Sequence, residues 1–286
     1  MKILTNKMDW NIVPKGLTCM FFGPPKTHKT TEASKWSSKG SEGVLVIDTE
    51  LGADYVEGVN RIVCTELNEP MRPVFKDGKQ ALDNKGMPMF ETTPPEERGY
   101  VYSTGTDIGK PMPVYSFAEI VSYIVEQVSL GTFAYETVVI DTIDEVNDWV
   151  ERAVCDELEI KAMGEGNYGA DWALSRNKTS NVLTLLKNTL KKAGVTLILI
   201  SHSKTTTIVK DKVQLGPDLP KGLAKKIMGM CELIGYVSID ERTHDAYINF
   251  SGFDEIQMGS RLKPLSGQKI KFGYEYFVNK ITSYTD

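Results

Sequence analysis

A short segment near the N-terminus, Gly-Pro-Pro-Lys-Thr-His-Lys-Thr at residues 23–30, has the residue types and spacing of a phosphate-binding loop. Gly23, Lys29 and Thr30 match the pattern G-x-x-x-x-G-K-[ST], and an apolar run typical of a buried strand precedes them. In such a loop, backbone N–H groups surround the phosphates, the lysine contacts the β- and γ-phosphates, and the hydroxyl binds Mg²⁺. The nucleotide-binding residues predicted from this segment are Gly23, Pro24, Pro25, Lys26, Thr27, His28, Lys29, Thr30 and Thr31.

One position departs from the pattern, because His28 replaces the second glycine. Glycine is usual there, since the backbone adopts a conformation that a Cβ atom resists. Histidine tolerates left-handed conformations better than most residues do. We therefore expect the loop to form, with weaker nucleotide affinity or an altered geometry. For Lys26, the additional cation in the loop, a solvent-facing position is the preferred interpretation.

Carboxylates follow two other apolar runs and are candidates for metal binding and general-base catalysis. Asp141 ends the run TVVID, and we predict that it helps to hold Mg²⁺, directly or through water; the alternative is that it only caps the next helix. Glu50 follows the run VLVI and is predicted to be the base that polarises the attacking water. Asp48, nearer the sheet, is interpreted as structural. Glu145 is a weaker candidate base, because Thr142 and Glu145 fit a capping box.

His202 follows the apolar run LILI and is the candidate for sensing the γ-phosphate. Either its imidazole or the hydroxyls of Ser201 and Ser203 can hydrogen-bond to a phosphate oxygen. The alternative is a structural histidine. His244 lies in a polar turn without a partner in the sequence and receives no role.

The elements that must position these residues alternate between strands and helices. Buried strands are predicted at residues 17–22, 44–47, 137–140 and 195–200, with a short one at 62–63. Helices are predicted from residue 30 to 39, from Ser116 with Glu119 as capping-box partner, from Thr142, and through residues 182–190. Shorter strands are predicted at 233–239, 246–250, 270–272 and 276–281.

This alternation predicts an α/β fold with a mostly parallel sheet flanked by helices. Ligands bind at the carboxyl ends of the strands in such sheets, where the loop, Glu50, Asp141 and His202 all lie. We interpret residues 1–286 as a single domain. Residues 66–113, rich in proline and glycine, are predicted to be a loop-rich insertion with a hairpin around Asp77 and Gly78. Residues 233–286 are predicted to form a C-terminal strand region.

Composition excludes several classes of protein. The chain has 286 residues, of which 41% are apolar and 25% charged, and its net charge of −5 argues against a polybasic nucleic-acid coat. No run approaches the roughly 20 apolar residues that cross a bilayer, and no signal peptide is recognisable. Four scattered cysteines without a CxxC pair argue against a zinc site or a disulfide framework. We therefore expect a cytoplasmic location and no membrane contact.

The net charge conceals two regions of opposite sign. Residues 136–159 contain nine acidic residues against Arg152 alone, a local charge of −8. Residues 202–226 contain six lysines against two aspartates, a local charge of +4. Any contact with nucleic acid is therefore expected on the side of residues 202–226.

Taken in order, the segments MFFGPPKTHKTT, VLVIDTELGAD, TVVIDTIDEV and LILISHSK resemble the core of RecA/KaiC-like P-loop ATPases. The chain looks most like the phage nucleotide-binding proteins of the RecA-like single-strand annealing group. The resemblance covers most of residues 12–239. It implies that Lys29 and Thr30 bind phosphate and Mg²⁺, that Asp141 is the second metal-holding residue, that Glu50 is the catalytic glutamate and that His202 is the γ-phosphate sensor.

The resemblance also implies partners. In RecA-like proteins, loops before and after the sensor strand bind single-stranded DNA, and here these are residues 163–171, with Tyr168 as a stacking residue beside Asn167, and 204–226. A homo-oligomer is expected, with Arg261 acting in trans on a neighbour's nucleotide. The predicted function is Mg²⁺-dependent ATP hydrolysis coupled to single-stranded DNA in phage-type recombination or annealing, in a bacterial host cell if a phage encodes the protein. The alternatives are a nucleotide-gated scaffold with little turnover and, last, a small-molecule kinase.

Overall fold

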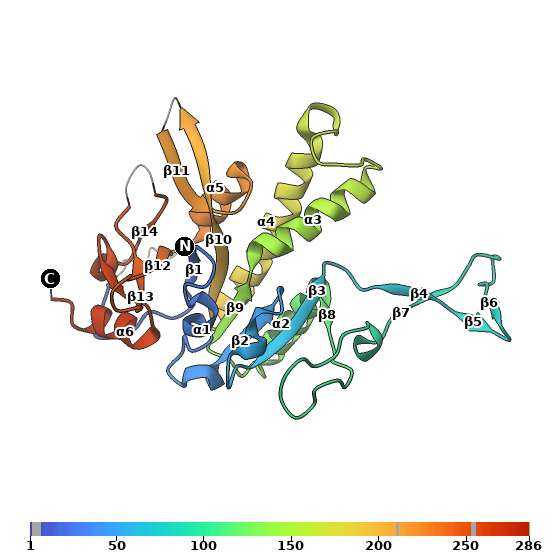
Figure 1. Cartoon of the computed structure of the whole chain (residues 1–286), viewed down its shortest axis with the longest axis horizontal. Coiled ribbons are helices and arrows are strands. Elements are labelled where there is room, and N and C mark those ends of the chain that lie inside the picture. Colours follow the sequence, from blue (N-terminus) through green and yellow to red (C-terminus); the bar gives the residue numbers. More distant parts are fainter. Residues whose placement is uncertain (2–6, 210–211, 253–255, 286) are drawn as a thin grey trace.

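A large central sheet organises the computed structural model, which describes residues 1, 7–209, 212–252 and 256–285 (Figure 1). Within those residues, seven neighbouring strands run parallel, and shorter antiparallel strands extend the sheet at one end. Along the sheet the order is β15 (Lys269–Lys271), β13 (Ala246–Asn249), β12 (Leu233–Ile239), β1 (Thr18–Gly23), β10 (Thr196–Val209), β9 (Thr137–Asp141), β2 (Val44–Asp48), β3 (Arg61–Glu66) and β8 (Tyr115–Ser116). The prediction of a mostly parallel α/β sheet flanked by helices is confirmed.

The register of the parallel strands brings their carboxyl ends into line. Gly23, the last residue of β1, lies opposite His202 of β10. Asp141, the last residue of β9, lies opposite both Ile200 of β10 and Asp48 of β2. Segments that lie far apart in the sequence therefore leave the sheet at one edge, where the candidate functional residues meet.

Helices cover both faces of the sheet, so alternate residues of one strand reach two different cores. Met20 and Phe22 of β1 pack in a core with residues of α2 (Phe117–Leu130), α3 (Ile143–Glu157), α4 (Ala170–Lys192) and α5 (Lys221–Met230). Cys19 and Phe21 pack on the other side with Trp36 and with α6 (Tyr274–Thr282). The central strands are thus buried on both faces, which explains why their sequences are continuously apolar.

Three expectations about the elements are wrong. The helix expected from residue 30 to 39 is α1 (Lys29–Ala33), because the Ser34 and Ser37 hydroxyls donate to nearby backbone carbonyls and compete with helical pairing. Residues 276–281 belong to a helix, α6, whose Phe277 and Ile281 lie one turn apart on its buried side. A short apolar run does not distinguish these two outcomes by itself.

The third correction concerns the segment that begins at residue 204, which was expected to be a loop after the sensor strand. Strand β10 instead continues to Val209 and pairs with β11 (Lys212–Pro217), forming a long hairpin. Three consecutive threonines, Thr205 to Thr207, favour this extension because β-branched residues suit an extended backbone.

Residues 67–113, here called the arm, extend away from the sheet (Figure 1, right). Two small two-stranded sheets form much of it: β4 (Met71–Pro73) pairs with β7 (Phe90–Thr92), and β5 (Phe75–Lys76) pairs with β6 (Lys79–Gln80). The predicted hairpin at Asp77 and Gly78 is confirmed, since both residues have positive φ as a tight turn requires. The division of the chain into one domain with an insertion and a C-terminal region stays a prediction.

Candidate functional site

The loop between β1 and α1 forms with a side chain at the position where the pattern has glycine. His28 has φ 62° and ψ 20°, the left-handed conformation expected there, and its carbonyl accepts from Glu32 N–H at 3.0 Å to begin α1. Lys26 also has positive φ. At the start of the loop Gly23 is required, because a Cβ atom would lie 2.3 Å from the carbonyl oxygen of Val237. The start of the loop therefore packs closely against β12, and His28 adopts the backbone conformation that glycine usually provides.

The Lys29 side chain is buried and folds back over the loop. Its ammonium donates to the carbonyl oxygens of Gly23 and Pro24, at 3.0 and 2.7 Å. Burial lowers the pKa of Lys29, and the carboxylates of Asp141, Asp144 and Glu50 oppose that shift. The ammonium thus lies within the loop that the sequence predicts to surround phosphates.

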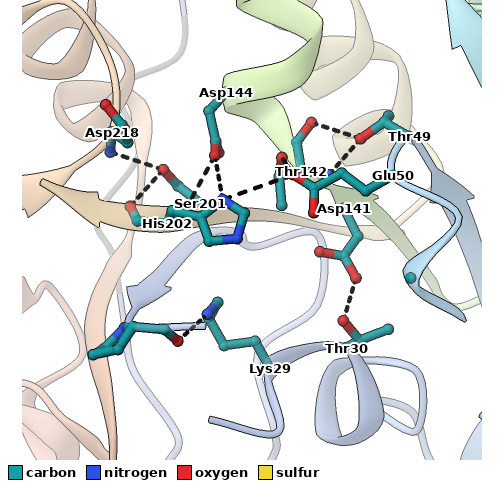
Figure 2. A network of polar contacts seen from close by, with 12 residues as sticks. Lys29, Thr30, Thr49, Glu50, Asp141, Thr142, Asp144, Ser201, His202 and Asp218 are labelled. Atoms are coloured by element: carbon teal, nitrogen blue, oxygen red, sulfur yellow. Dashed lines mark hydrogen bonds and ion pairs between the residues drawn. The ribbon is translucent and has the colours of Figure 1, made fainter. Parts of the chain in front are cut away.

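Thr30 and Asp141 meet across the edge of the sheet. The Thr30 hydroxyl donates to the Asp141 carboxylate at 2.5 Å (Figure 2). Burial raises the pKa of Asp141 to about 6; the Thr30 hydrogen bond lowers it, whereas the charges of Asp48 and Glu50 raise it further. A hydroxyl and a carboxylate are the hard oxygen donors that Mg²⁺ prefers, and a cation would relieve the cost of burying this carboxylate. These residues therefore fit a magnesium ion.

Glu50 is held by the segment that follows β9. Its carboxylate accepts from the Thr142 hydroxyl at 2.8 Å, and Thr142 N–H donates to the Thr49 hydroxyl at 2.6 Å. The predicted capping box is wrong, since the Thr142 side chain makes no cap hydrogen bond and bonds to Glu50 instead. Glu145 pairs with Arg152 at 3.4 Å. The rival base Glu145 does not line the cleft that Glu50 lines.

Asp48 has structural contacts, in agreement with its interpretation from the sequence. It is 1% exposed and accepts from Arg61 at 2.7 Å and from Gly52 N–H at 3.0 Å. These contacts shape the turn that carries Glu50 away from β2.

His202 meets a residue that the sequence analysis did not select, Asp144 in the first turn of α3. The imidazole Nδ1 lies 2.7 Å from the Asp144 carboxylate and 3.7 Å from that of Glu50 (Figure 2). The Asp144 hydrogen bond raises the pKa of His202. Only the register between β9 and β10 places these residues together, so no local signal identified Asp144. Ser201 is buried, and its hydroxyl accepts from Asp218 N–H at 3.0 Å, which is a structural role.

Many of the predicted site residues line one cleft of about 630 Å³, within the roughly 300–1,000 Å³ typical of small-molecule sites. The structure therefore brings most of the predicted site residues together. The residues lining the cleft are Pro25, Lys26, Thr27, His28, Lys29, Thr30, Thr31, Glu50, Gly52, Val56, Asp141, Thr142 and His202. Gly23 and Pro24 begin the loop and bind the Lys29 ammonium.

The remaining predicted residues do not line this cleft. Arg261 donates to the Gly229 carbonyl at 2.8 Å. In residues 163–171, Tyr168 is fully exposed just before α4, and in residues 204–226 the ammonium of Lys204 pairs with Asp218 at 2.9 Å. Two of the charges predicted to matter for DNA, residues 210 and 211, lie outside the described residues. The 163–171 segment and the β10–β11 hairpin both extend toward the top of Figure 1.

A protein-family model described as an AAA domain matches residues 15–267, which include every residue of the cleft. The chain belongs to this AAA domain family. An AAA domain is a P-loop nucleotide-binding domain, in agreement with the loop at residues 23–30. In the described part of this AAA domain, no helix is both long and apolar enough to cross a membrane.

Two solved structures are similar to this AAA domain. One, a crystal structure of the RadB recombinase, is 13% identical with a TM-score of 0.39 and covers 92% of this chain and 90% of that chain. The other, the KaiC-like protein PH0186 from the hyperthermophilic archaeon Pyrococcus horikoshii OT3, is 17% identical with a TM-score of 0.41 and covers 90% and 85%. No curated protein sequence matches the chain.

Proposed function

We propose that this AAA domain binds ATP with Mg²⁺ in the cleft and hydrolyses it. The observation that carries the proposal is the contact between the Thr30 hydroxyl and the Asp141 carboxylate, which lie 111 residues apart in the sequence. P-loop ATPases hold magnesium with such a pair, a hydroxyl from the loop and a carboxylate from a neighbouring strand.

The predicted site residues of the cleft have different parts in this reaction. The backbone N–H groups of residues 26–28 and the Lys29 ammonium bind the phosphates, while Thr30 and Asp141 hold the metal ion. A magnesium ion held by Thr30 and Asp141 would neutralise negative charge on the phosphates. Glu50 orients a water molecule and accepts its proton as the water oxygen bonds to the γ-phosphorus and ADP leaves. His202 contacts the γ-phosphate from β10.

The ATPase is tested by steady-state hydrolysis with Mg²⁺. We expect Lys29→Ala to lower the rate by about 100-fold or more, as loss of one positioned donor to the reacting group does. The matched control is Lys35→Ala, which removes an exposed lysine just after α1. Equal rates for Lys29→Ala and the wild type would contradict the proposal.

We further propose that the ATPase acts on single-stranded DNA in recombination or annealing, as a homo-oligomer. Positive charge supports this, because Lys221, Lys225 and Lys226 of α5 are exposed near the base of the β10–β11 hairpin. Arg261 is exposed and does not line the cleft of its own chain, as expected of a residue that acts on a neighbour's nucleotide. Single-stranded DNA should raise the hydrolysis rate, and its binding should weaken as salt increases. Hydrolysis unaffected by DNA would remove this part while leaving the ATPase in place.

A nucleotide-gated scaffold with little turnover is the second candidate, favoured by the arm. Met71, Phe75, Leu82, Met87 and Phe90 are each more than half exposed there, an unusual density of apolar side chains on a surface. Tight ATP binding without hydrolysis would support this candidate, and rapid turnover would exclude it. A cytoplasmic location and a phage origin stay predictions.

A further inference from the structure

Two donors of one residue converge on a single carboxylate oxygen of Asp144. The Nδ1 atom of His202 lies 2.7 Å from this oxygen, and the His202 backbone N–H donates to it at 3.4 Å. The side chain of Asp144 is 13% exposed, and it comes from α3, whereas His202 comes from β10. The contact therefore ties the sensor strand to the helix that follows Asp141.

An ionised carboxylate only accepts hydrogen bonds, so this contact requires a proton on Nδ1 of His202. With Nδ1 engaged, the remaining ring nitrogen, Nε2, is turned away from Asp144 toward the side of the cleft where Lys29 lies (Figure 2). That is where the loop would hold the terminal phosphate of a nucleotide. Without the contact to Asp144, the imidazole would be free to rotate about its bond to Cβ, and Nε2 would not keep pointing to this side of the cleft.

The other carboxylate oxygen of Asp144 indicates that this arrangement has a free-energy cost. This atom, Oδ1, is buried and has no hydrogen-bond partner among the described residues. Buried polar atoms are almost always paired, and unpaired ones concentrate at functional sites. A carboxylate held in this way only to stabilise the fold would be expected to use both of its oxygens.

We propose that Asp144 is a positioning residue, which fixes the ring orientation and the Nδ1-protonated form of His202 so that Nε2 contacts the γ-phosphate. This inference rests on the proposed function, because it assigns a role within the same cleft. The groups that face His202 are Asp144 from α3, Glu50 after β2 and Lys29 from α1. The Asp144 hydrogen bond and the charges of the two carboxylates raise the pKa of the ring, whereas burial and the Lys29 ammonium lower it.

A metal ion is the other way to join these groups. One ligand atom from each of Glu50, Asp144 and His202 lies within 4.8 Å of the other two. A metal on Nδ1 requires that nitrogen to be deprotonated, whereas the hydrogen bond to Asp144 requires a proton on it. The short contact favours the hydrogen bond.

The first measurement is the hydrolysis of ATP by Asp144→Asn, an isosteric change. We expect kcat to fall by about 10- to 100-fold, the usual effect of removing a partner that orients a histidine. KM should stay within about threefold of the wild type, because ground-state binding of the nucleotide is unchanged. The matched control is Asp148→Asn, which removes the same charge from an exposed position one turn along α3.

The second measurement does not depend on turnover. The chain has three histidines, so ¹⁵N spectra of the imidazoles are simple, and His202→Gln assigns the signal of His202. The wild-type signal should be that of a ring protonated at Nδ1, and Asp144→Asn should shift it toward a mixture of tautomers. Folding of the variant is checked by the unchanged signals of His28 and His244.

The outcomes separate the two ideas. If the wild type does not hydrolyse ATP, the proposed function fails. If the wild type hydrolyses ATP but Asp144→Asn has the same kcat as Asp148→Asn, the positioning role is overturned. It is also overturned if the loss of kcat in Asp144→Asn is matched by an equal loss of affinity for the nucleotide. An unchanged His202 spectrum in Asp144→Asn would overturn it as well.

Discussion

The cleft and the arm distribute their polar and apolar groups in opposite ways. In the cleft, polar side chains contact one another: Thr30 binds Asp141, Thr142 binds Glu50, and Asp144 binds His202. In the outer arm, large apolar side chains face solvent, and its ion pairs, such as that of Arg72 with Glu91, are exposed. The polar groups of the cleft therefore hold one another in place, whereas we expect the outer arm to contribute little to the stability of the core.

The base of the arm resembles the cleft more than the tip does. The Arg98 side chain is 3% exposed, and its guanidinium binds both oxygens of Glu119, at 2.7 and 3.0 Å. It also donates to the carbonyl oxygens of Thr93 and Val114. Glu119 in turn completes the predicted capping box with Ser116 at the start of α2. The contribution that a polar contact makes to stability is thus expected to depend on how deeply its side chains are buried and on the partners they share, more than on their position in the sequence.

The largest effect is expected in the cleft, from Glu50→Gln. This change keeps a partner for the Thr142 hydroxyl but removes the base, so hydrolysis should fall by about 100- to 10,000-fold. ATP binding, measured by fluorescence of a labelled nucleotide, should be almost unchanged. A rate near that of the wild type would identify another residue as the base.

Two arginines of the arm provide a matched pair for stability. Arg98→Ala should lower the free energy of unfolding by about 2–4 kcal/mol, because it leaves Glu119 and two carbonyls without their buried donor. Arg72→Ala, at an exposed ion pair that solvent screens, should lower it far less. Urea unfolding of both variants measures the difference, and similar losses would break the distinction between base and tip.

The cleft should also show that function and stability conflict at Asp141. Burial raises the pKa of this carboxyl from 3.8 to about 6, so the charged form is disfavoured in the folded state. Asp141→Asn should therefore stabilise the nucleotide-free, metal-free protein by about 2–3 kcal/mol at pH 8. The gain should shrink as the pH falls through 6 and vanish below about pH 4, where the carboxyl is protonated in both states. A destabilised variant at pH 8 would contradict the inferred cost of burial.

The smallest effect is expected from removing the outer arm. Thr93 N–H donates to the Pro70 carbonyl at 2.8 Å, so a two-residue Asn-Gly turn in place of residues 71–92 would keep this hydrogen bond as that of a β-turn. Hydrolysis should stay within about twofold of the wild type, and stability within about 1 kcal/mol. Loss of hydrolysis would show that the arm acts on the cleft. If hydrolysis is kept but a protein partner no longer binds, the result would favour the scaffold function.

Local signals in the sequence predicted the elements whose determinants lie within a few residues. The Gly23 to Thr30 spacing, the Ser116 capping box and the Asp77-Gly78 turn are examples, and each has the expected local structure. The wrong expectations concern segments whose state is decided by distant contacts. Residues 276–281 form a helix because Phe277 packs with Trp36 and Phe21, and residues 204–209 extend β10 because β11 pairs with them.

The sequence by itself determined the chemistry that is available: a phosphate loop, carboxylates after apolar strands and a histidine after another. The tertiary structure alone decided which of these groups meet. Spacing along the chain does not say which parallel strands are neighbours, because long helical connections separate them. The order β1, β10, β9 and β2 places Thr30 on Asp141 and His202 on Asp144, and it directs Thr142 to Glu50 instead of to its own helix.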